Sequence, residues 1–283
     1  MSIEVKDLKK KYFKKEAVKG ATFTIESESI IGLLGRNGAG KSTVLNMIAR
    51  RIEKTSGEIT LDGVDLHKNP NAMHEVYLSS SDNWFPREYK FKDLLAIYQG
   101  TYPEFDMEFA QDLIKVFDVN VKGKYSKAST GYQSIMKIIL ALCNPSEYIF
   151  LDEPVLGLDA NHRQLFNKKL LEAYARRPRT FVIATHLIEE VASILEKVIV
   201  IKDGVVTEEV LVEDVLRKGY VVSGASTLVE EYVADKKVLE TDRIGNFTRS
   251  VVIGAIGEAQ PGLEFSPLTL QDYFISITRK ENE

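Results

Sequence analysis

Apolar runs followed by helical patterns recur along the first 200 residues. The runs at 30–34, 148–151 and 181–185 lack the polar alternation of a half-exposed strand, which is typical of strands in the middle of a parallel sheet. Helical spacing follows the first run at 44–48 and the second from about residue 160 to 176. This order predicts an α/β fold, whose ligands bind at the carboxyl ends of the strands.

Other stretches around this core have different patterns. Residues 91–142 are mostly helical in pattern, and we expect a helical subdomain at about 86–145 in which Asp106 caps a helix. Residues 187–197 predict a helix, and residues 198–201 and 205–210 predict a closing hairpin.

The N-terminal stretch predicts strands that lead up to the first apolar run. Residues 3–8 and 21–25 are apolar or alternating, and residues 57–63 run into an Asp-Gly turn. The basic residues 9–15 between the first two strands are expected to form a solvated turn. Tyr12 lies within it, and its ring could stack on a purine base.

The pattern changes at about residue 211, so we expect domains at 1–210 and 211–283. Strand and helix patterns after residue 219 predict a small α+β module of βαββα order, with Pro267 in the first turn of the final helix. No cluster of acids, histidine or cysteine in this module has catalytic spacing. We therefore expect a packing or dimerisation appendage.

Composition narrows the class of protein. The chain has 283 residues, 28% of them charged, and a formal net charge of −4, so nothing favours a nucleic-acid partner. No apolar run approaches the ~20 residues that span a bilayer, the N-terminus lacks a secretion signal pattern, and Cys143 is the single cysteine. We expect a cytoplasmic protein that reaches a membrane only through a partner.

A phosphate-binding loop follows the first apolar run. Residues 35–43 read GRNGAGKST and fit the pattern G-x-x-x-x-G-K-[ST] between a strand and a helix. The glycines allow backbone N–H groups to point at a phosphate chain, and the helix N-terminus adds partial positive charge. Lys41 can reach the β- and γ-phosphates, and Ser42 can bind magnesium. This stretch predicts a nucleotide site.

Three further signals lie beyond the phosphate-binding loop. Asp152 and Glu153 end the second apolar run, and His186 ends the third, where ligands bind in open α/β sheets. Before them, residues 128–133 read ASTGYQ at the start of a helical pattern.

Together these features resemble the nucleotide-binding subunit of ABC transporters. The resemblance covers residues 1 to about 210 and depends on Tyr12, the loop 35–43, the signature-like residues 129–133, the pair Asp152-Glu153 and His186, all in the family's order. It implies a P-loop ATPase fold with a mixed core sheet, an antiparallel β subdomain and a helical subdomain. A narrower likeness points to bacterial exporters of peptides, toxins or antibiotics, which also carry a C-terminal appendage.

The resemblance implies a role for each matching residue. Tyr12 would stack on adenine, Asp152 with Ser42 would hold Mg²⁺, Glu153 would be the general base, and His186 would contact the γ-phosphate. Ser129 and Gly131 would act on ATP bound to a second ATP-binding subunit, and the dimer would drive a separate membrane permease. The triphosphate would be held by Gly35, Asn37, Gly38, Gly40, Lys41, Ser42 and Thr43.

The chain departs from the family pattern at three places. The family's glutamine after the strand 76–78 falls near Ser80, with Asp82 close by, and Leu156 stands where serine is usual. Thr130 replaces a glycine of the signature and Ala128 replaces a leucine, and a β-branched residue tolerates positive φ poorly. We expect hydrolysis that is intact but slower or more dependent on the partner.

Two other functions are considered. A soluble ABC ATPase of translation or DNA repair would usually carry two cassettes or a long coiled-coil insertion, which this chain lacks. A regulatory subunit that hydrolyses poorly and pairs with an active partner would also account for the departures.

Overall fold

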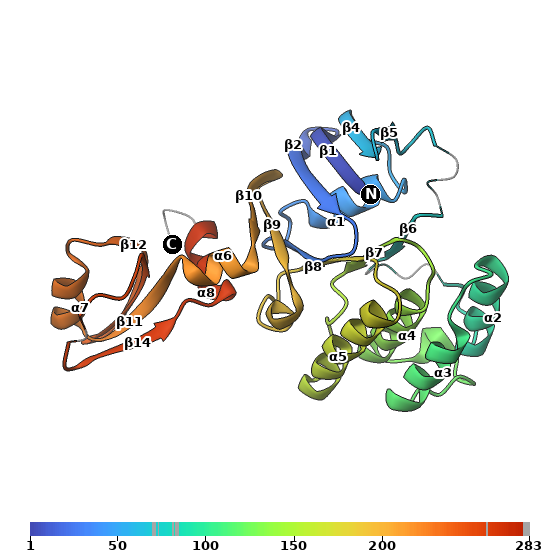
Figure 1. The fold of residues 1–283 in the computed structure, drawn as a ribbon. Coiled ribbons are helices and arrows are strands. Elements are labelled where there is room, and N and C mark those ends of the chain that lie inside the picture. Colours follow the sequence, from blue (N-terminus) through green and yellow to red (C-terminus); the bar gives the residue numbers. More distant parts are fainter. Residues whose placement is uncertain (70–71, 73, 81, 83–84, 259, 280–283) are drawn as a thin grey trace. The chain divides into compact units, whose positions relative to one another are not determined.

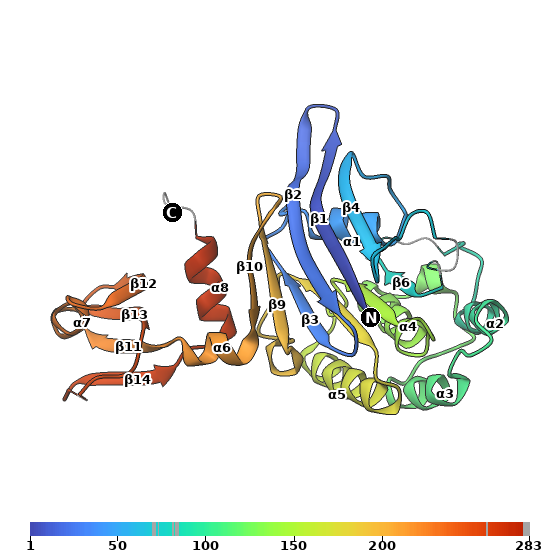
Figure 2. The ribbon, with the colours of Figure 1, turned by 45° about the horizontal axis from the view of Figure 1, so that its top comes forward.

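The computed structural model of the chain describes residues 1–69, 72, 74–80, 82, 85–258 and 260–279. The chain divides into two compact units, Met1–Glu209 and Val210–Glu283 (Figures 1 and 2). Within the described residues, none of the helices combines the length and the apolar character needed to cross a membrane.

A six-stranded sheet forms the centre of the first unit. Its strand order is β10-β9-β3-β8-β7-β6, with parallel pairing from β9 through β6. Every residue of β3, β7 and β8 is buried, as the uninterrupted apolar runs predict. The hairpin β9–β10 turns at Asp203 and Gly204, so the sheet is mixed and the α/β fold class is confirmed. The strands are β3 (Ile30–Leu34), β6 (Val76–Ser79), β7 (Tyr148–Asp152), β8 (Thr180–Thr185), β9 (Lys197–Lys202) and β10 (Val205–Leu211).

An antiparallel sheet of order β2-β1-β4-β5 covers the helix α1 (Lys41–Ile48). Apolar residues of both sheets and of α1 form one continuous core, and Figure 1 shows α1 and α4 on opposite sides of the parallel sheet. The phosphate-binding loop is therefore anchored at both ends by buried apolar side chains. The strands are β1 (Ser2–Tyr12), β2 (Lys15–Glu26), β4 (Ser56–Leu61) and β5 (Val64–Asp65).

The expectation of a solvated turn at residues 9–15 is wrong. Residues 9–12 belong to β1, Lys15 begins β2, and only Phe13 and Lys14 form the turn. The paired strands continue past the core with polar side chains, so cross-strand hydrogen bonds hold them where hydrophobic burial does not. Tyr12 is thus the last residue of a strand.

Four α-helices cover the other side of the sheet and its flank. The helix α4 contacts α2, α3, α5, β6 and β7, so it joins the helical insertion to the core sheet. Asp106 caps α3 as predicted, since its carboxylate accepts a hydrogen bond from Phe109 N at 2.9 Å. The helices are α2 (Phe91–Thr101), α3 (Met107–Val116), α4 (Thr130–Leu142) and α5 (Ala160–Arg176), with a short 3₁₀ turn, η2 (Tyr125–Lys127).

The helix expected at 187–197 does not form. That stretch contains only the 3₁₀ turn η3 (Ala192–Ile194). Ile188, Val191 and Ile194 are buried, although only the last of them belongs to η3 and the residues before it form irregular turns. The apolar spacing was therefore a correct sign of burial and a wrong sign of α-helix.

The second unit is a four-stranded antiparallel sheet with three helices. Its strand order is β12-β13-β11-β14, which adds a strand to the predicted βαββα order. Pro267 ends the edge strand β14, opposite Tyr220, where a missing N–H is tolerated. The last helix instead begins at Leu270. Thr269 is its N-cap, since the Thr269 hydroxyl accepts a hydrogen bond from Asp272 N at 3.1 Å. The elements are α6 (Val212–Arg217), β11 (Gly219–Ala225), α7 (Ser226–Val233), β12 (Lys237–Ile244), β13 (Phe247–Ile253), β14 (Leu263–Pro267) and α8 (Leu270–Thr278).

Candidate functional site

The loop between β3 and α1 has the backbone of a phosphate cradle. Gly38 and Gly40 have φ of 82° and 112°, a region that L side chains rarely adopt. A Cβ on Gly40 would lie 2.8 Å from Ala17 O, and one on Gly35 would lie 2.6 Å from Ile201 O. The loop thus needs glycine both for conformation and for close packing, and it brings the N–H groups at the start of α1 to one point.

Lys41 is the buried cation of this loop. Its ammonium donates to Gly35 O at 2.6 Å and lies 3.5 Å from Glu153 Oε1, and the residue is 6% exposed. Burial lowers the pKa of Lys41, although the nearby Glu153 carboxylate acts in the opposite direction. The loop and the end of β7 therefore converge on one ammonium group.

Two hard oxygen donors meet beside the loop. Ser42 Oγ donates to Asp152 Oδ1 at 3.1 Å, and Asp152 is 4% exposed. Among the described residues, no group of three or more histidine, cysteine and acidic side chains could hold a metal ion. One carboxylate and one hydroxyl fit Mg²⁺, which takes few protein ligands and completes its shell with phosphate oxygens and water.

Glu153 is held by Thr185, the last residue of β8, and by His186, which follows it. Its Oε2 accepts a hydrogen bond from Thr185 Oγ1 at 3.0 Å, and Oε1 lies 2.9 Å from His186 Nδ1. A carboxylate only accepts, so Nδ1 carries the proton and Nε2 of a neutral imidazole is left as an acceptor. Glu153 has φ of 52°, an unusual backbone conformation for a residue other than glycine and one that recurs at functional sites.

Thr185 was missed by the sequence reasoning. Its signal was its place at the end of β8, one residue before His186.

A pocket of about 330 Å³ joins most of the predicted nucleotide-binding residues. Tyr12 stands at the end of β1, is 42% exposed and has the Lys10 ammonium 4.9 Å from its ring centroid. Lys15 and Ala17 from β2 also line the pocket and were not predicted. The pocket is lined by Tyr12, Lys15, Ala17, Asn37, Gly38, Ala39, Gly40, Lys41, Ser42, Thr43 and Glu153.

Ser129 and Gly131 lie apart from this pocket, at the start of α4. The Ser129 hydroxyl accepts a hydrogen bond from Tyr132 N at 3.3 Å as the helix N-cap. Thr130 is the first residue of the helix and has an ordinary backbone, so its β-branch is accommodated. A Cβ on Gly131 would lie 2.3 Å from Gly157 O, which means that this helix start packs directly on the loop that follows Glu153.

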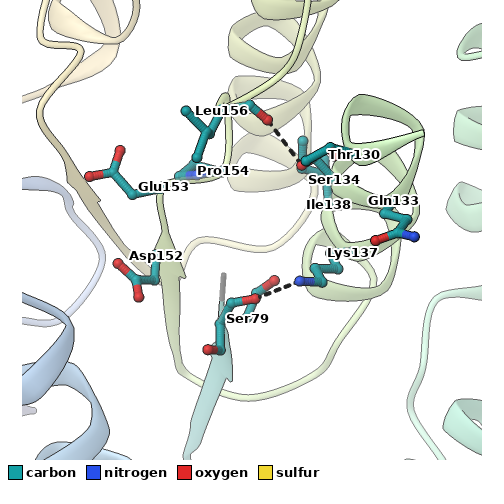
Figure 3. Close-up of a pocket in the computed structure, with 11 residues that line it drawn as sticks. Ser79, Thr130, Gln133, Ser134, Lys137, Ile138, Asp152, Glu153, Pro154 and Leu156 are labelled. Atoms are coloured by element: carbon teal, nitrogen blue, oxygen red, sulfur yellow. Dashed lines mark hydrogen bonds between the residues drawn. The ribbon is translucent and has the colours of Figure 1, made fainter. Parts of the chain in front are cut away.

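A second, smaller pocket separates α4 from the end of β7 (Figure 3). Lys137 points from α4 toward the strand that carries Ser79, with Asp152 at the end of the neighbouring strand β7 and Glu153 just after it. The Lys137 ammonium donates to Ser80 O at 3.0 Å and to Asp82 O at 2.9 Å. Burial lowers the pKa of Lys137, while Asp82 acts in the opposite direction. Sequence reasoning identified Ser80 and missed Lys137, because its helical pattern looked purely structural.

Known proteins are similar to this chain in sequence and in fold. A family model described as ABC transporter matches residues 18–156. The ABC transporter ATP-binding protein YtrB of Bacillus subtilis is 31% identical over 240 residues, which cover 85% of this chain and 78% of that protein. The Nod factor export ATP-binding protein I of Burkholderia lata is 26% identical, over 99% of this chain and 97% of that protein.

Solved structures agree on the fold. A dimeric structure of MJ0796, described as a bacterial ABC transporter cassette, superposes with a TM-score of 0.65 at 23% identity, covering 74% of this chain and 98% of that chain. Sequence similarity to YtrB and the matching cassette fold lead to one conclusion: this chain belongs to the family of ABC transporter ATP-binding proteins.

Proposed function

We propose that this chain is the ATP-hydrolysing subunit of an ABC transporter and drives a separate membrane permease. The observation that carries the proposal is the position of Glu153. Its carboxylate is held by Thr185 and His186 at the end of the parallel sheet, 3.5 Å from the Lys41 ammonium of the phosphate-binding loop.

The chain's own groups account for binding of a triphosphate. The backbone N–H groups of residues 38–43 cradle the phosphates, and Lys41 neutralises the β- and γ-phosphates. Ser42 and Asp152 would hold Mg²⁺, which would supply neutralisation of phosphate charge.

Hydrolysis follows from the placement of Glu153. Its carboxylate orients a water molecule and accepts a proton from it as the water oxygen attacks the γ-phosphorus, and the bond to the leaving β-phosphate oxygen breaks. Thr185 and His186 hold the carboxylate from behind. Nε2 of His186 then faces the terminal phosphate, where it accepts from water when neutral or donates to phosphate when protonated.

Ser129 and Gly131 at the start of α4, called the signature corner below, are proposed to act on ATP bound to a second subunit. Ser129 and Gly131 stand at the N-terminus of α4, where free N–H groups and the helix dipole favour an anion, yet they do not line the pocket of the phosphate-binding loop. The related cassette MJ0796 is described as dimeric. We infer a head-to-tail dimer in which each corner covers the γ-phosphate of the other subunit's ATP.

Self-assembly has a direct kinetic test. The ATPase rate per subunit of the purified chain is expected to rise steeply with protein concentration and then saturate. A flat rate close to zero at all concentrations would show instead that a distinct partner subunit completes the site.

Export is the direction we propose, with a peptide, toxin or antibiotic as cargo. The support for the direction is the relative named for Nod factor export, whose alignment covers 99% of this chain and therefore extends into the second unit. We propose that this unit is an accessory packing or dimerisation module and that the chain sits on the cytoplasmic face of the membrane through the permease. Co-purification with the permease, followed by flux measurements in inside-out and right-side-out vesicles, tests partner and direction together.

Replacing Tyr12 by alanine is expected to weaken ATP binding about fivefold, because a stacking contact with a half-exposed ring is worth about 1 kcal/mol. Fluorescence titration with a labelled ATP analogue measures the change. Tyr12→Phe keeps the ring and is expected to bind like the parent. Phe13→Ala removes the neighbouring, fully exposed ring and serves as the control; equal effects at both positions would argue against stacking on Tyr12.

A further inference from the structure

Lys137 is a half-buried cation that the mechanism above does not use. It lies in the third turn of α4, and its ammonium reaches across a pocket of about 70 Å³ to the segment that follows β6. Among the described residues of that segment, it donates to the backbone carbonyls of Ser80 and Asp82, at 3.0 and 2.9 Å. Asp152 and Glu153 line the same pocket, so the ammonium shares this pocket with the residues proposed for magnesium and for the attacking water.

The partial burial of this ammonium has an energetic cost. Burial lowers the pKa of Lys137, and the Arg51 guanidinium adds to that effect, whereas Asp82 and Asp152 oppose it. A lysine that only solubilised the helix would extend into water, since its ammonium is strongly hydrated. Charge-assisted hydrogen bonds to carbonyl groups are the compensation that keeps it inside.

The segment that Lys137 holds has a short side chain where a long one is usual. Ser80 is 6% exposed, and its hydroxyl accepts a hydrogen bond from Asp82 N at 3.1 Å. The hydroxyl therefore stabilises the turn of its own segment and has little reach toward Asp152. A serine side chain at position 80 is shorter than a glutamine side chain and extends less far toward Asp152.

The helix that carries Lys137 also carries the signature corner. Ser129 caps α4, and Lys137 lies eight residues further along the sequence, which is about 12 Å along a helix axis. One rigid element thus connects the corner proposed to face the second subunit with the segment beside Asp152 and Glu153.

We propose that Lys137 is a positioning residue of the hydrolytic site. Its ammonium holds the backbone of Ser80 and Asp82 against α4. This contact keeps the segment after β6 in a fixed position beside the proposed magnesium and water positions. In this chain, a cation from α4 replaces the anchoring that a longer residue at position 80 would provide. The inference rests on the proposed ATPase function.

The test compares Lys137→Met with Lys137→Arg in the full-length protein. Methionine keeps the length and loses the charge, and we expect kcat for ATP hydrolysis to fall about 10- to 100-fold, while KM for ATP changes less than about threefold, as for loss of an interaction that positions reacting groups. Arginine keeps the charge and the donors, and it is expected to recover most of kcat. The Mg²⁺ concentration for half-maximal rate should rise in Lys137→Met, a change that a general loss of stability would not produce.

Two controls make the result decisive. Lys168→Met removes an exposed lysine from α5 and should leave kcat, KM and the Mg²⁺ dependence unchanged. Amide hydrogen exchange at Ser80 and Asp82 should quicken in Lys137→Met and stay close to the parent in Lys137→Arg, whether or not the chain hydrolyses ATP.

The outcomes separate this inference from the proposed function. Parent-like kcat and Mg²⁺ dependence in Lys137→Met, with parent hydrolysis intact, would overturn the positioning role alone. If the parent and all variants bind ATP without hydrolysing it, the proposed function fails, and the exchange measurement still decides whether Lys137 holds the segment.

Discussion

Replacing Glu153 by glutamine is expected to lower kcat for ATP hydrolysis by about 10²- to 10⁴-fold, the range that a general base contributes. The amide cannot accept the proton of the attacking water. It keeps the size of the carboxylate. Glutamine is also no more restricted than glutamate at the backbone φ of 52° that residue 153 adopts. ATP affinity should change little, because the phosphate-binding loop and Lys41 are left intact.

Single-turnover and steady-state ATPase assays measure this effect, and gel filtration with ATP measures assembly. The variant should accumulate as an ATP-bound dimer, since binding proceeds and cleavage does not. Glu147→Gln is the matched control: Glu147 directly precedes the other end of β7 and pairs with Arg177 at 2.9 Å. Hydrolysis by Glu153→Gln at the parent rate would remove Glu153 from the role of base.

The local structure around the proposed site follows most directly from the sequence where a chemical motif and a structural pattern coincide. The loop 35–43 needs its glycines for φ and for packing, and Asp152 ends a strand whose residues are all buried, with Glu153 directly after it. Both signals are local, so a single sequence contains them. The end of α5 at Arg176 was predicted for the same reason, because its helical pattern stops there.

The misses arise where long-range pairing decides the structure. The strands β1 and β2 extend through the lysines because they pair with each other, and β14 forms at the edge of a sheet by pairing with β11. Neither segment has the apolar pattern of a buried strand, so propensity alone could not reveal it.

Lys137 shows the same limit within the site. Its neighbours Met136, Ile138 and Ile139 are buried, and in a helical pattern a single lysine among apolar residues indicates only a polar edge of the helix. Its role depends on the segment after β6, which is more than 50 residues away in the sequence. The proposed role of Thr185 likewise depends on a distant residue, Glu153, to which its hydroxyl donates a hydrogen bond.

Replacing Gly131 by alanine is expected to destabilise the protein by about 1–3 kcal/mol, the range of overpacking in a dense site, and to lower kcat at least about 100-fold. The added Cβ would lie 2.3 Å from Gly157 O and 3.2 Å from Gly157 C. These are backbone atoms, so no rotamer change can relieve the overlap, and the start of α4 must separate from the loop that follows Glu153. The same substitution would also displace the N–H groups that we propose to face the second subunit's ATP.

Gly100→Ala provides the matched control for this substitution, since it too adds a methyl group to a helix. A Cβ on Gly100 in α2 would meet nothing within 4 Å, so this change should stabilise the protein by about 0.5–1 kcal/mol through helix propensity and leave kcat unchanged. Thermal unfolding and ATPase assays on both variants separate the two proposed roles of Gly131, which are packing against Gly157 and contact with the second subunit's ATP. If Gly131→Ala unfolds like the parent but no longer hydrolyses ATP, the glycine serves only the contact with nucleotide across the dimer. A lower unfolding temperature together with lost hydrolysis shows that packing on Gly157 within one subunit links the signature corner to the position of Glu153.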